Sequence, residues 1–136
     1  MKQTTLSIST PGRNLTEITG QVAAFVAESH VQQGLCHLFI RHTSASLMIN
    51  ENADPDVQRD LETFLGDLVP DGDPRYVHTA EGPDDMPAHV RALLTHTDLT
   101  IPISDGRLAL GTWQGIFLWE HRHRPHHRKV VITLQG

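Results

Sequence analysis

The chain has 136 residues, of which 38% are hydrophobic and 20% charged, and its formal net charge is −5 at pH 7. This length suits a single domain spanning residues 1–136, with a composition typical of folded proteins rather than disordered ones. The acidic balance and the lack of a dense Lys/Arg cluster argue against a nucleic-acid partner. No apolar run has the length of a membrane helix or a secretion signal, so we expect no membrane partner.

The single cysteine and the ten histidines are informative. Cys36 lies in the apolar run GLCHLFI and cannot form an internal disulfide, so we expect a buried, unreactive thiol in a reducing cytoplasm. Imidazole is both a proton carrier near neutral pH and a common metal ligand. The positions of the histidines therefore decide what they indicate.

The first half of the chain predicts strands alternating with helices. TTLSIS alternates as a strand, and apolar residues then recur at helical spacing over residues 16–28, with Thr16 or Thr19 as the candidate cap. LCHLFIRH predicts a strand whose apolar face ends in His42. A short strand, LMIN, precedes the DP pair at residues 54–55, which favours a helix start because proline at the first helical position gives up no needed hydrogen bond.

The second half predicts one helix followed by several strands. VPDGDPRY has the composition of a loop, and Asp84 or Asp85 is expected to cap the next helix, whose apolar residues should face inward: Met86, Val90, Leu93 and Leu94. LTIPI, LALGT, QGIFLWEH and KVVITL then read as strands, with a tight hairpin at Asp105-Gly106. About three helices among about seven strands indicate a single compact α+β domain with a largely antiparallel sheet.

A first polar motif, HTSASLMINENADP, runs from residue 42 to residue 55. A strand, a turn and a helix cap commonly recruit these residue types, and Asp54 is well explained as the cap. His42 ends an apolar face and Glu51 lies where no cap is needed, so these two are candidate site residues.

A second motif, YVHTAEGPDDMPAH, contains His78, Glu81, Asp85 and His89. A histidine in the first turn of a helix lies near the positive end of the helix dipole, which favours the neutral ring that can bind a metal. A surface histidine or a satisfied core histidine is the alternative for either ring alone. The spacing of the two rings matches no standard zinc finger.

A third motif, GTWQGIFLWEHR, places Glu120 and Arg122 in line with apolar side chains. Either the two pair with each other as an internal ion pair, or Glu120 is a site carboxylate and Arg122 an anion ligand. Glycines on both sides of Trp113 and Gln114 permit a bulge that aims these side chains. The histidine-rich stretch EHRHRPHHRK that overlaps this motif is interpreted as a solvated hairpin tip.

Together, the three motifs resemble the YjbQ family, whose members are described as secondary thiamine-phosphate synthases. The resemblance covers nearly the whole chain in the same order, and only the histidine-rich stretch after Arg122 departs from the family pattern. It implies a compact α+β homotrimer with polar pockets near subunit boundaries. It also implies a weak ability to join the pyrimidine pyrophosphate and thiazole phosphate halves of thiamine.

The family pattern marks a set of positions across the three motifs. These are His42, Thr43, Asn50, Glu51, Asp54, His78, Glu81, Asp85, His89, Trp113, Gln114, Glu120 and Arg122.

Our leading hypothesis is a small metal-assisted enzyme in which His42, His78 and His89 hold one divalent cation and leave a position open for substrate. Three imidazoles suit zinc, whereas magnesium, the alternative with a pyrophosphate substrate, prefers carboxylates. The expected catalytic residues are Asn50, Glu51, Glu81 and Glu120, the three carboxylates being candidates for the general base or for orienting a ligand. The expected contacts to a phosphate-containing substrate are Thr43, Asp85, Trp113, Gln114 and Arg122.

Two alternatives use the same residues. The chain could be a non-catalytic trimeric module that binds a small anionic ligand through Arg122 and the imidazoles. The histidines could instead be purely structural and hold subunits together.

Overall fold

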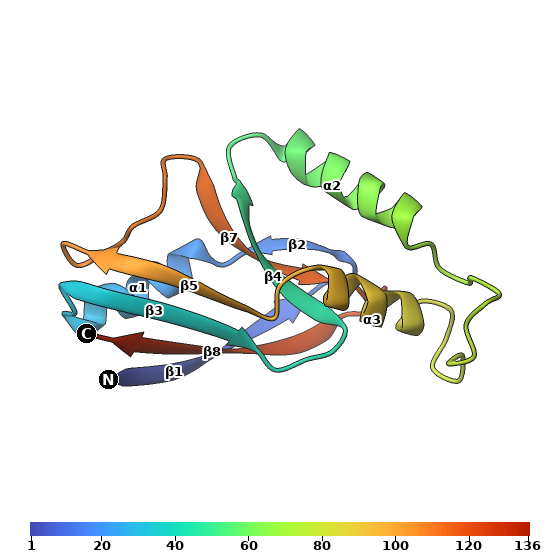
Figure 1. The fold of residues 1–136 in the computed structure, drawn as a ribbon, viewed down its shortest axis with the longest axis horizontal. Helices are drawn as coiled ribbons and strands as arrows, with labels where there is room; N and C mark the ends of the chain where they lie inside the picture. The colour runs from blue at the N-terminus through green and yellow to red at the C-terminus, as the bar shows by residue number, and fades with distance from the viewer.

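The computed structural model describes residues 1–136 and contains two antiparallel sheets (Figure 1). The five-stranded sheet has the order β1 (Lys2–Thr10), β8 (His126–Gln135), β3 (Gln33–Ile40), β5 (Asp98–Ser104) and β6 (Arg107–Leu108). The three-stranded sheet has the order β2 (Asn14–Glu17), β7 (Gln114–Glu120) and β4 (Ala45–Glu51). All strand pairs are antiparallel.

Three helices complete the domain: α1 (Thr19–Ser29), α2 (Pro55–Leu68) and α3 (Asp85–Leu94). The predicted single α+β domain with three helices and antiparallel sheets is confirmed. No helix is both long enough and apolar enough to cross a membrane.

The main core lies between the five-stranded sheet, α1 and one face of the three-stranded sheet. The predicted inner face of β3 is confirmed, because Cys36, Leu38 and Ile40 are at most 1% exposed. A smaller cluster, which includes Phe117 and Trp119, lies between the other face of β7 and α2. Because β7 is covered on both faces, its side chains do not alternate between interior and solvent.

The start of α1 differs from the prediction. Thr16 belongs to β2, a strand that the helical pattern did not predict, and it pairs with Leu118 of β7. The helix α1 begins only at Thr19. Ile18 occupies the N-cap position and makes no side-chain cap bond. The Thr19 hydroxyl instead accepts the Ile116 backbone N–H at 2.8 Å, so it ties the helix to β7 rather than capping it.

Two strong local signals are confirmed. Asp54 caps α2 by accepting the Asp56 backbone N–H at 2.9 Å, with Pro55 in the first helical position. Asp105 and Gly106 form the β5–β6 turn with φ values of 54° and 76°, the positive values that a type I′ hairpin turn requires.

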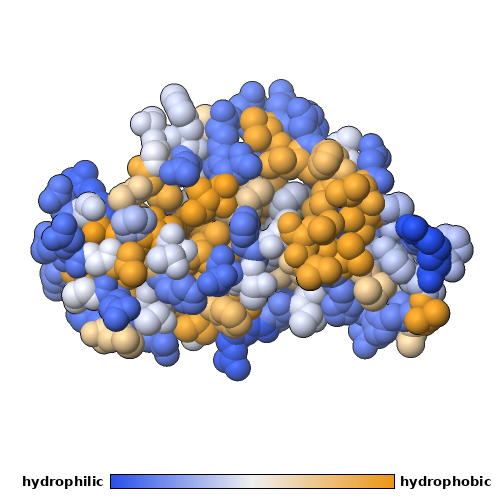
Figure 2. Space-filling model, in the orientation of Figure 1, coloured by the Kyte–Doolittle hydropathy of each residue, from blue (hydrophilic) through white to orange (hydrophobic).

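The predicted orientation of α3 is wrong for Leu93 and Leu94, whereas the partly buried Val90 packs against the cluster between β7 and α2. Leu93 and Leu94 are 81% and 56% exposed, and the helix instead buries Asp85 and Arg91 together with two small residues. Asp85 is bound by Arg122, and Arg91 is bound by Glu62, so charged contacts from distant segments set the rotation of the helix. An apolar patch consequently faces solvent over α3 (Figure 2).

Candidate functional site

Two histidines and one aspartate meet at the start of α3. Asp85 and His89 lie one turn apart on the helix, and His78 reaches them from the loop that precedes it. Asp85 Oδ2 lies 2.6 Å from His78 Nε2 and 3.3 Å from His89 Nε2, and the three donor atoms lie within 4.8 Å of one another. We call this set the His78–Asp85–His89 cluster.

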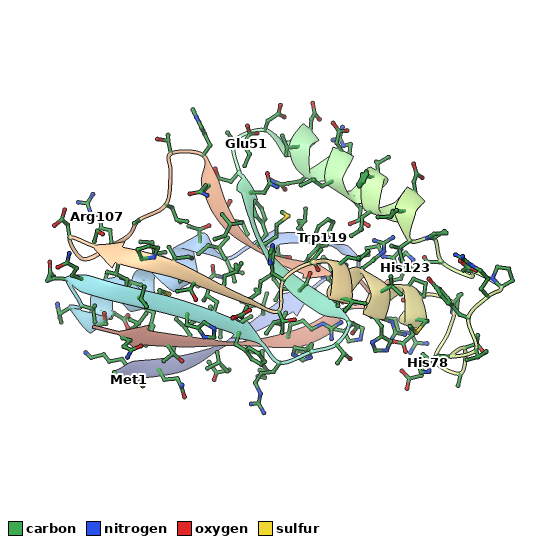
Figure 3. The ribbon with its side chains drawn as sticks, viewed as in Figure 1. Met1, Glu51, His78, Arg107, Trp119 and His123 are labelled. Atoms are coloured by element: carbon green, nitrogen blue, oxygen red, sulfur yellow. The ribbon has the colours of Figure 1, made fainter.

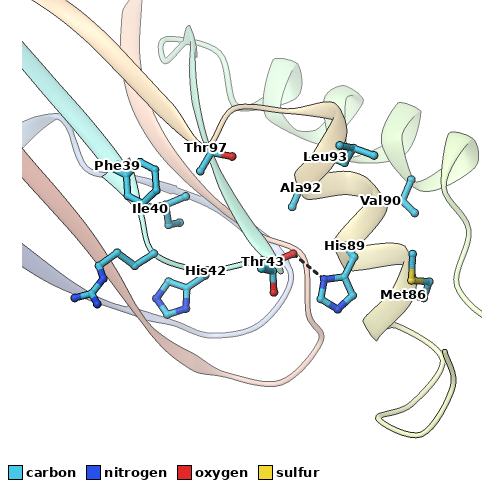
Figure 4. A pocket seen from close by; sticks show the side chains of 11 residues that line it. Phe39, Ile40, His42, Thr43, Met86, His89, Val90, Ala92, Leu93 and Thr97 are labelled. Atoms are coloured by element: carbon cyan, nitrogen blue, oxygen red, sulfur yellow. Dashed lines mark hydrogen bonds between the residues drawn. The ribbon is translucent and has the colours of Figure 1, made fainter.

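The Thr43 carbonyl fixes the tautomer of His89. His89 Nδ1 lies 3.0 Å from that carbonyl oxygen, which can only accept, so Nδ1 carries a proton (Figure 4). In the neutral ring, Nε2 then directs a lone pair at the carboxylate oxygen of Asp85. Two acceptors 3.3 Å apart repel each other unless a proton or a metal cation neutralises them. A metal-binding histidine characteristically donates its other ring N–H to a carbonyl in this way.

Arg122 holds Asp85 from the other side. Its NH1 donates to Asp85 Oδ1 at 2.7 Å, its Nε donates to Asp84 at 3.0 Å, and its NH2 donates to the Glu81 carbonyl at 3.0 Å. Burial alone would raise the pKa of Asp85, but the His78 hydrogen bond and the Arg122 charge outweigh it and hold this pKa below its usual range. Asp85 is therefore ionised at neutral pH, as a metal ligand must be.

The loop that carries His78 is tied down by Asp71. The Asp71 carboxylate receives two hydrogen bonds of 2.9 Å from Arg13 and lies 2.8 Å from His123 Nε2. Asp84 accepts the His123 backbone N–H at 2.9 Å. The segment after β7 therefore positions both ends of the loop, which lacks regular secondary structure of its own.

His42 lies outside the His78–Asp85–His89 cluster. Its Nε2 accepts the Lys129 backbone N–H at 2.8 Å, so this nitrogen is already occupied within the subunit. Burial and the charge of Arg128 lower the pKa of His42, which keeps the ring neutral. The predicted set of three imidazoles is therefore not assembled within one subunit, and Asp85 supplies the third donor.

His42 and His89 instead share a groove of about 630 Å³ between α3 and the end of β3 (Figure 4). Thr43 lies between them, and the rest of the lining is mainly apolar. The predicted substrate contact at Thr43 thus lies beside the cluster.

Glu120 pairs with Arg128, not with Arg122. It is fully buried, and it also accepts the Thr10 hydroxyl at 2.7 Å and the Arg122 backbone N–H at 3.1 Å. Burial would raise the pKa of Glu120, but the hydrogen bonds from Arg128 and the other donors lower it. The interpretation of Glu120 and Arg122 as each other's side-chain partners is wrong. Glu120 therefore has a structural role, and neither of its carboxylate oxygens is exposed to a ligand.

The remaining predicted residues lie at the opposite end of the three-stranded sheet. Glu51 pairs with Gln114 in the β4–β7 ladder, whereas Ala45, at the end near the cluster, pairs with Glu120. Six residue steps along β4 correspond to about 20 Å. Figure 3 accordingly shows Glu51 far from His78.

Local bonds hold this second group in place. Asn50 Oδ1 accepts the Glu51 backbone N–H at 2.7 Å, and Gln114 Oε1 accepts the Gly111 backbone N–H at 2.8 Å. Trp113 is 63% exposed. One subunit therefore does not bring Asn50, Glu51, Trp113 and Gln114 to the cluster, whereas Glu81 contributes its carbonyl to it through Arg122.

The prediction of a solvated histidine-rich tip is wrong for one of its histidines and one of its arginines. His121 is 0% exposed, with Nε2 2.8 Å from the Ser46 hydroxyl, and Arg128 is 4% exposed. Burial, with the charge of Arg91, lowers the pKa of His121 to about 3. The missed signal was alternation, since His121 continues the Phe117 and Trp119 face, and Arg128 continues the buried positions of β8.

Comparison with known proteins identifies the family. The profile of the family described as "UPF0047 protein YjbQ-like" matches residues 4–136. The chain belongs to the YjbQ family. A curated YjbQ-family relative, a UPF0047 protein of Synechocystis, is 55% identical over 134 residues, covering 98% of this chain and 91% of the relative. The UPF0047 protein YjbQ of Escherichia coli is 44% identical over 135 residues, covering 98% and 97%.

Solved structures similar to this YjbQ-family chain share its fold over their full length. A hypothetical protein of Aeropyrum pernix superposes with a TM-score of 0.91 at 28% identity, covering 100% of this chain and 99% of that one. A conserved hypothetical protein of Thermus thermophilus gives 0.87 at 36% identity, covering 97% and 99%. The two-sheet domain with three helices is therefore the family fold.

Proposed function

We propose that this chain is a small metal-assisted enzyme with zinc held by His78, Asp85 and His89. The observation that carries the proposal is the hydrogen bond from His89 Nδ1 to the Thr43 carbonyl, because it turns the Nε2 lone pair toward the ionised Asp85. A cation placed between the donor atoms of His78, Asp85 and His89 would replace the repulsion between lone pairs with three metal–ligand contacts.

The donor set fits zinc. Two imidazole nitrogens and one carboxylate oxygen are the protein ligands of many catalytic zinc sites, and they leave a fourth position open. Bond lengths of 2.0–2.2 Å place neighbouring ligand atoms about 3.4 Å apart in a tetrahedral site, close to the 3.3 Å between Asp85 and His89. The 2.6 Å contact with His78 would have to lengthen. Magnesium fits less well because two of the three donors are nitrogen.

The reaction we propose is the joining of a pyrimidine pyrophosphate to a thiazole phosphate. The thiazole nitrogen forms a bond to the pyrimidine methylene carbon as the bond from that carbon to the pyrophosphate oxygen breaks. Bound zinc would supply stabilisation of the negative charge that leaves with pyrophosphate. Arg122 keeps Asp85 ionised and offers the remaining N–H groups of its guanidinium to the same anion.

The proposed reaction does not require a carboxylate base at the cluster. The attacking ring nitrogen carries no proton, so the step needs no general base. The burial of Glu120 and the distance of Glu51 therefore do not oppose it. The proposal includes a homotrimer, which is supported by the large apolar side chains that one subunit leaves exposed on several elements: Phe64, Leu68 and Trp113.

The second candidate is a non-catalytic trimeric module that binds a small anionic ligand. It is favoured by the hollow beside the cluster, where Arg122, Arg124 and His126 line a volume of about 510 Å³ with donors suited to an anion. In this case Arg122 and the imidazoles would contact the anion without transforming it.

The test combines metal content with turnover in untagged protein. We expect about one zinc per subunit by elemental analysis, lost in Asp85→Asn and His89→Ala and retained in the matched control His127→Ala, whose ring forms a hydrogen bond with the Ser9 hydroxyl on the five-stranded sheet. We expect slow formation of thiamine phosphate from the two precursors, and none in Asp85→Asn.

The outcomes separate the candidates. Zinc without product would favour the binding module, and product without zinc would refute the metal proposal. If chelation dissociated the oligomer while activity persisted, the histidines would have a structural role only.

A further inference from the structure

The outward face of α3 is unusually apolar. Met86, Val90 and Leu93 line the groove from the helix, and Phe39 lines it from β3. Leu93 is 81% exposed and Phe39 is 42% exposed, whereas soluble domains seldom expose large apolar side chains together without a function. The fold uses this face only in part: Val90 packs against the cluster between β7 and α2, whereas the buried side of α3 is formed by Asp85, Arg91 and small residues.

The groove and the proposed metal centre share one residue. His89 belongs to both, since its ring lines the groove and its Nε2 lies 3.3 Å from Asp85 Oδ2. Thr43 lies between His42 and His89 in the lining (Figure 4). His42 Nε2 accepts the Lys129 backbone N–H, and His42 Nδ1 lies 3.4 Å from Arg128 NH1, so both ring nitrogens have partners within the chain. The groove therefore combines apolar walls with a few polar side chains.

We infer that this groove binds the apolar ring of a small substrate whose acidic group reaches the His78–Asp85–His89 cluster. The ligand class is an aryl or heteroaryl phosphate ester. The inference rests on the proposed function, whose metal centre would receive the phosphate. Its support is the groove volume of about 630 Å³ and its mainly apolar lining, both typical of small-molecule sites with a few orienting polar groups.

A second copy of the chain is the competing occupant. Other exposed apolar residues, such as Leu68 on α2 and Trp113 before β7, line none of the hollows of the subunit, so contact between copies is sufficient to account for them. The α3 face differs because it is concave and ends on a candidate metal ligand. This difference favours a small molecule at α3.

The test compares 1-naphthyl phosphate with inorganic phosphate by calorimetric titration of the zinc-loaded protein. We expect the naphthyl ester to bind at least about tenfold more tightly, because burying part of the ring is favourable. Leu93→Gln should remove most of this difference without changing zinc content. The matched control Leu94→Gln, on the same helix but outside the groove, should retain it.

Three outcomes would overturn the inference: equal binding of the two phosphates, an unchanged difference in Leu93→Gln, or dissociation of the oligomer by Leu93→Gln but not by Leu94→Gln. Titration of the zinc-free protein separates this inference from the proposed function. If the protein takes up no zinc but still prefers naphthyl phosphate in a way that depends on Leu93, the inference about ring binding in the groove stands. The proposed zinc site is then refuted.

Discussion

The Glu120 carboxylate and the Arg128 guanidinium meet through two contacts in the interior, where neither side chain is more than 5% exposed. Glu120 also binds the Arg122 backbone N–H, and Arg122 in turn holds Asp85. A buried charge in β7 is therefore connected through one peptide group to the candidate site.

We expect Glu120→Leu to lower the free energy of unfolding by about 3–5 kcal/mol, because it leaves the Arg128 charge buried without its partner. The double variant Glu120→Leu/Arg128→Met should recover much of this loss, since a well-packed apolar pair replaces a buried ion pair at little cost. Urea unfolding followed by circular dichroism measures both. A double variant no more stable than the single one would contradict the account.

His121 should make the protein sensitive to acid. Its pKa is about 3 in the folded chain against 6.5 for the free side chain, so the unfolded state takes up a proton first as the pH falls below 6.5. Stability due to this group is complete above pH 6.5 and declines down to about pH 3. Between pH 7.5 and 4.5 the wild type should lose about 2–3 kcal/mol more than His121→Gln. Parallel pH profiles for the two proteins would show that the buried ring does not titrate in this way.

Asp54→Ala should destabilise the domain by about 1 kcal/mol, because it leaves the Asp56 backbone N–H at the start of α2 without its acceptor. Asp60→Ala, an exposed aspartate within the same helix, is the control and should change stability by less than about 0.5 kcal/mol. Thermal unfolding of the three proteins tests the prediction, and equal effects of the two substitutions would assign the loss to charge rather than to capping.

Cys36 should resist thiol reagents in the native protein. Burial raises its pKa to about 11, and the side chain is 0% exposed, so neither the thiolate nor a path to it is present at pH 8. Ellman's reagent should react with one thiol per chain in guanidinium chloride and with almost none without it. Rapid reaction of the native protein would reveal local opening of β3.

The sequence predicted those parts of the fold whose determining contacts are local. Pro55 after its capping aspartate, the Asp105-Gly106 turn and the alternation of β3 each involve neighbours within a few residues. The rotation of α3 depends on Arg122, which lies 37 residues from Asp85, and a helical apolar pattern contains no information about that contact. The β2 strand was missed because its four residues are stabilised by pairing with β7.

The candidate site, like the fold, was predicted only in the features that depend on local sequence. The motifs identified the residue types and included Asp85 and both imidazoles of the cluster, but they could not tell which side chains meet. His42 was grouped with them because it ends an apolar strand, whereas the structure gives its Nε2 to the Lys129 backbone. Alternation places His121 on the same face as Phe117 and Trp119, and the covering of that face by other elements, a tertiary contact, then buries the ring.

The position of Glu51 at the opposite end of β4 from Thr43, whose carbonyl binds His89, has a genetic consequence. The continuous β4–β7 ladder holds Glu51 at that far end within one chain. If one reaction needs both, then Glu51→Ala and His89→Ala subunits, each inactive alone, should complement each other when co-expressed. Oligomers that contain both variants would include some subunit interfaces at which one chain supplies Glu51 and its neighbour supplies His89.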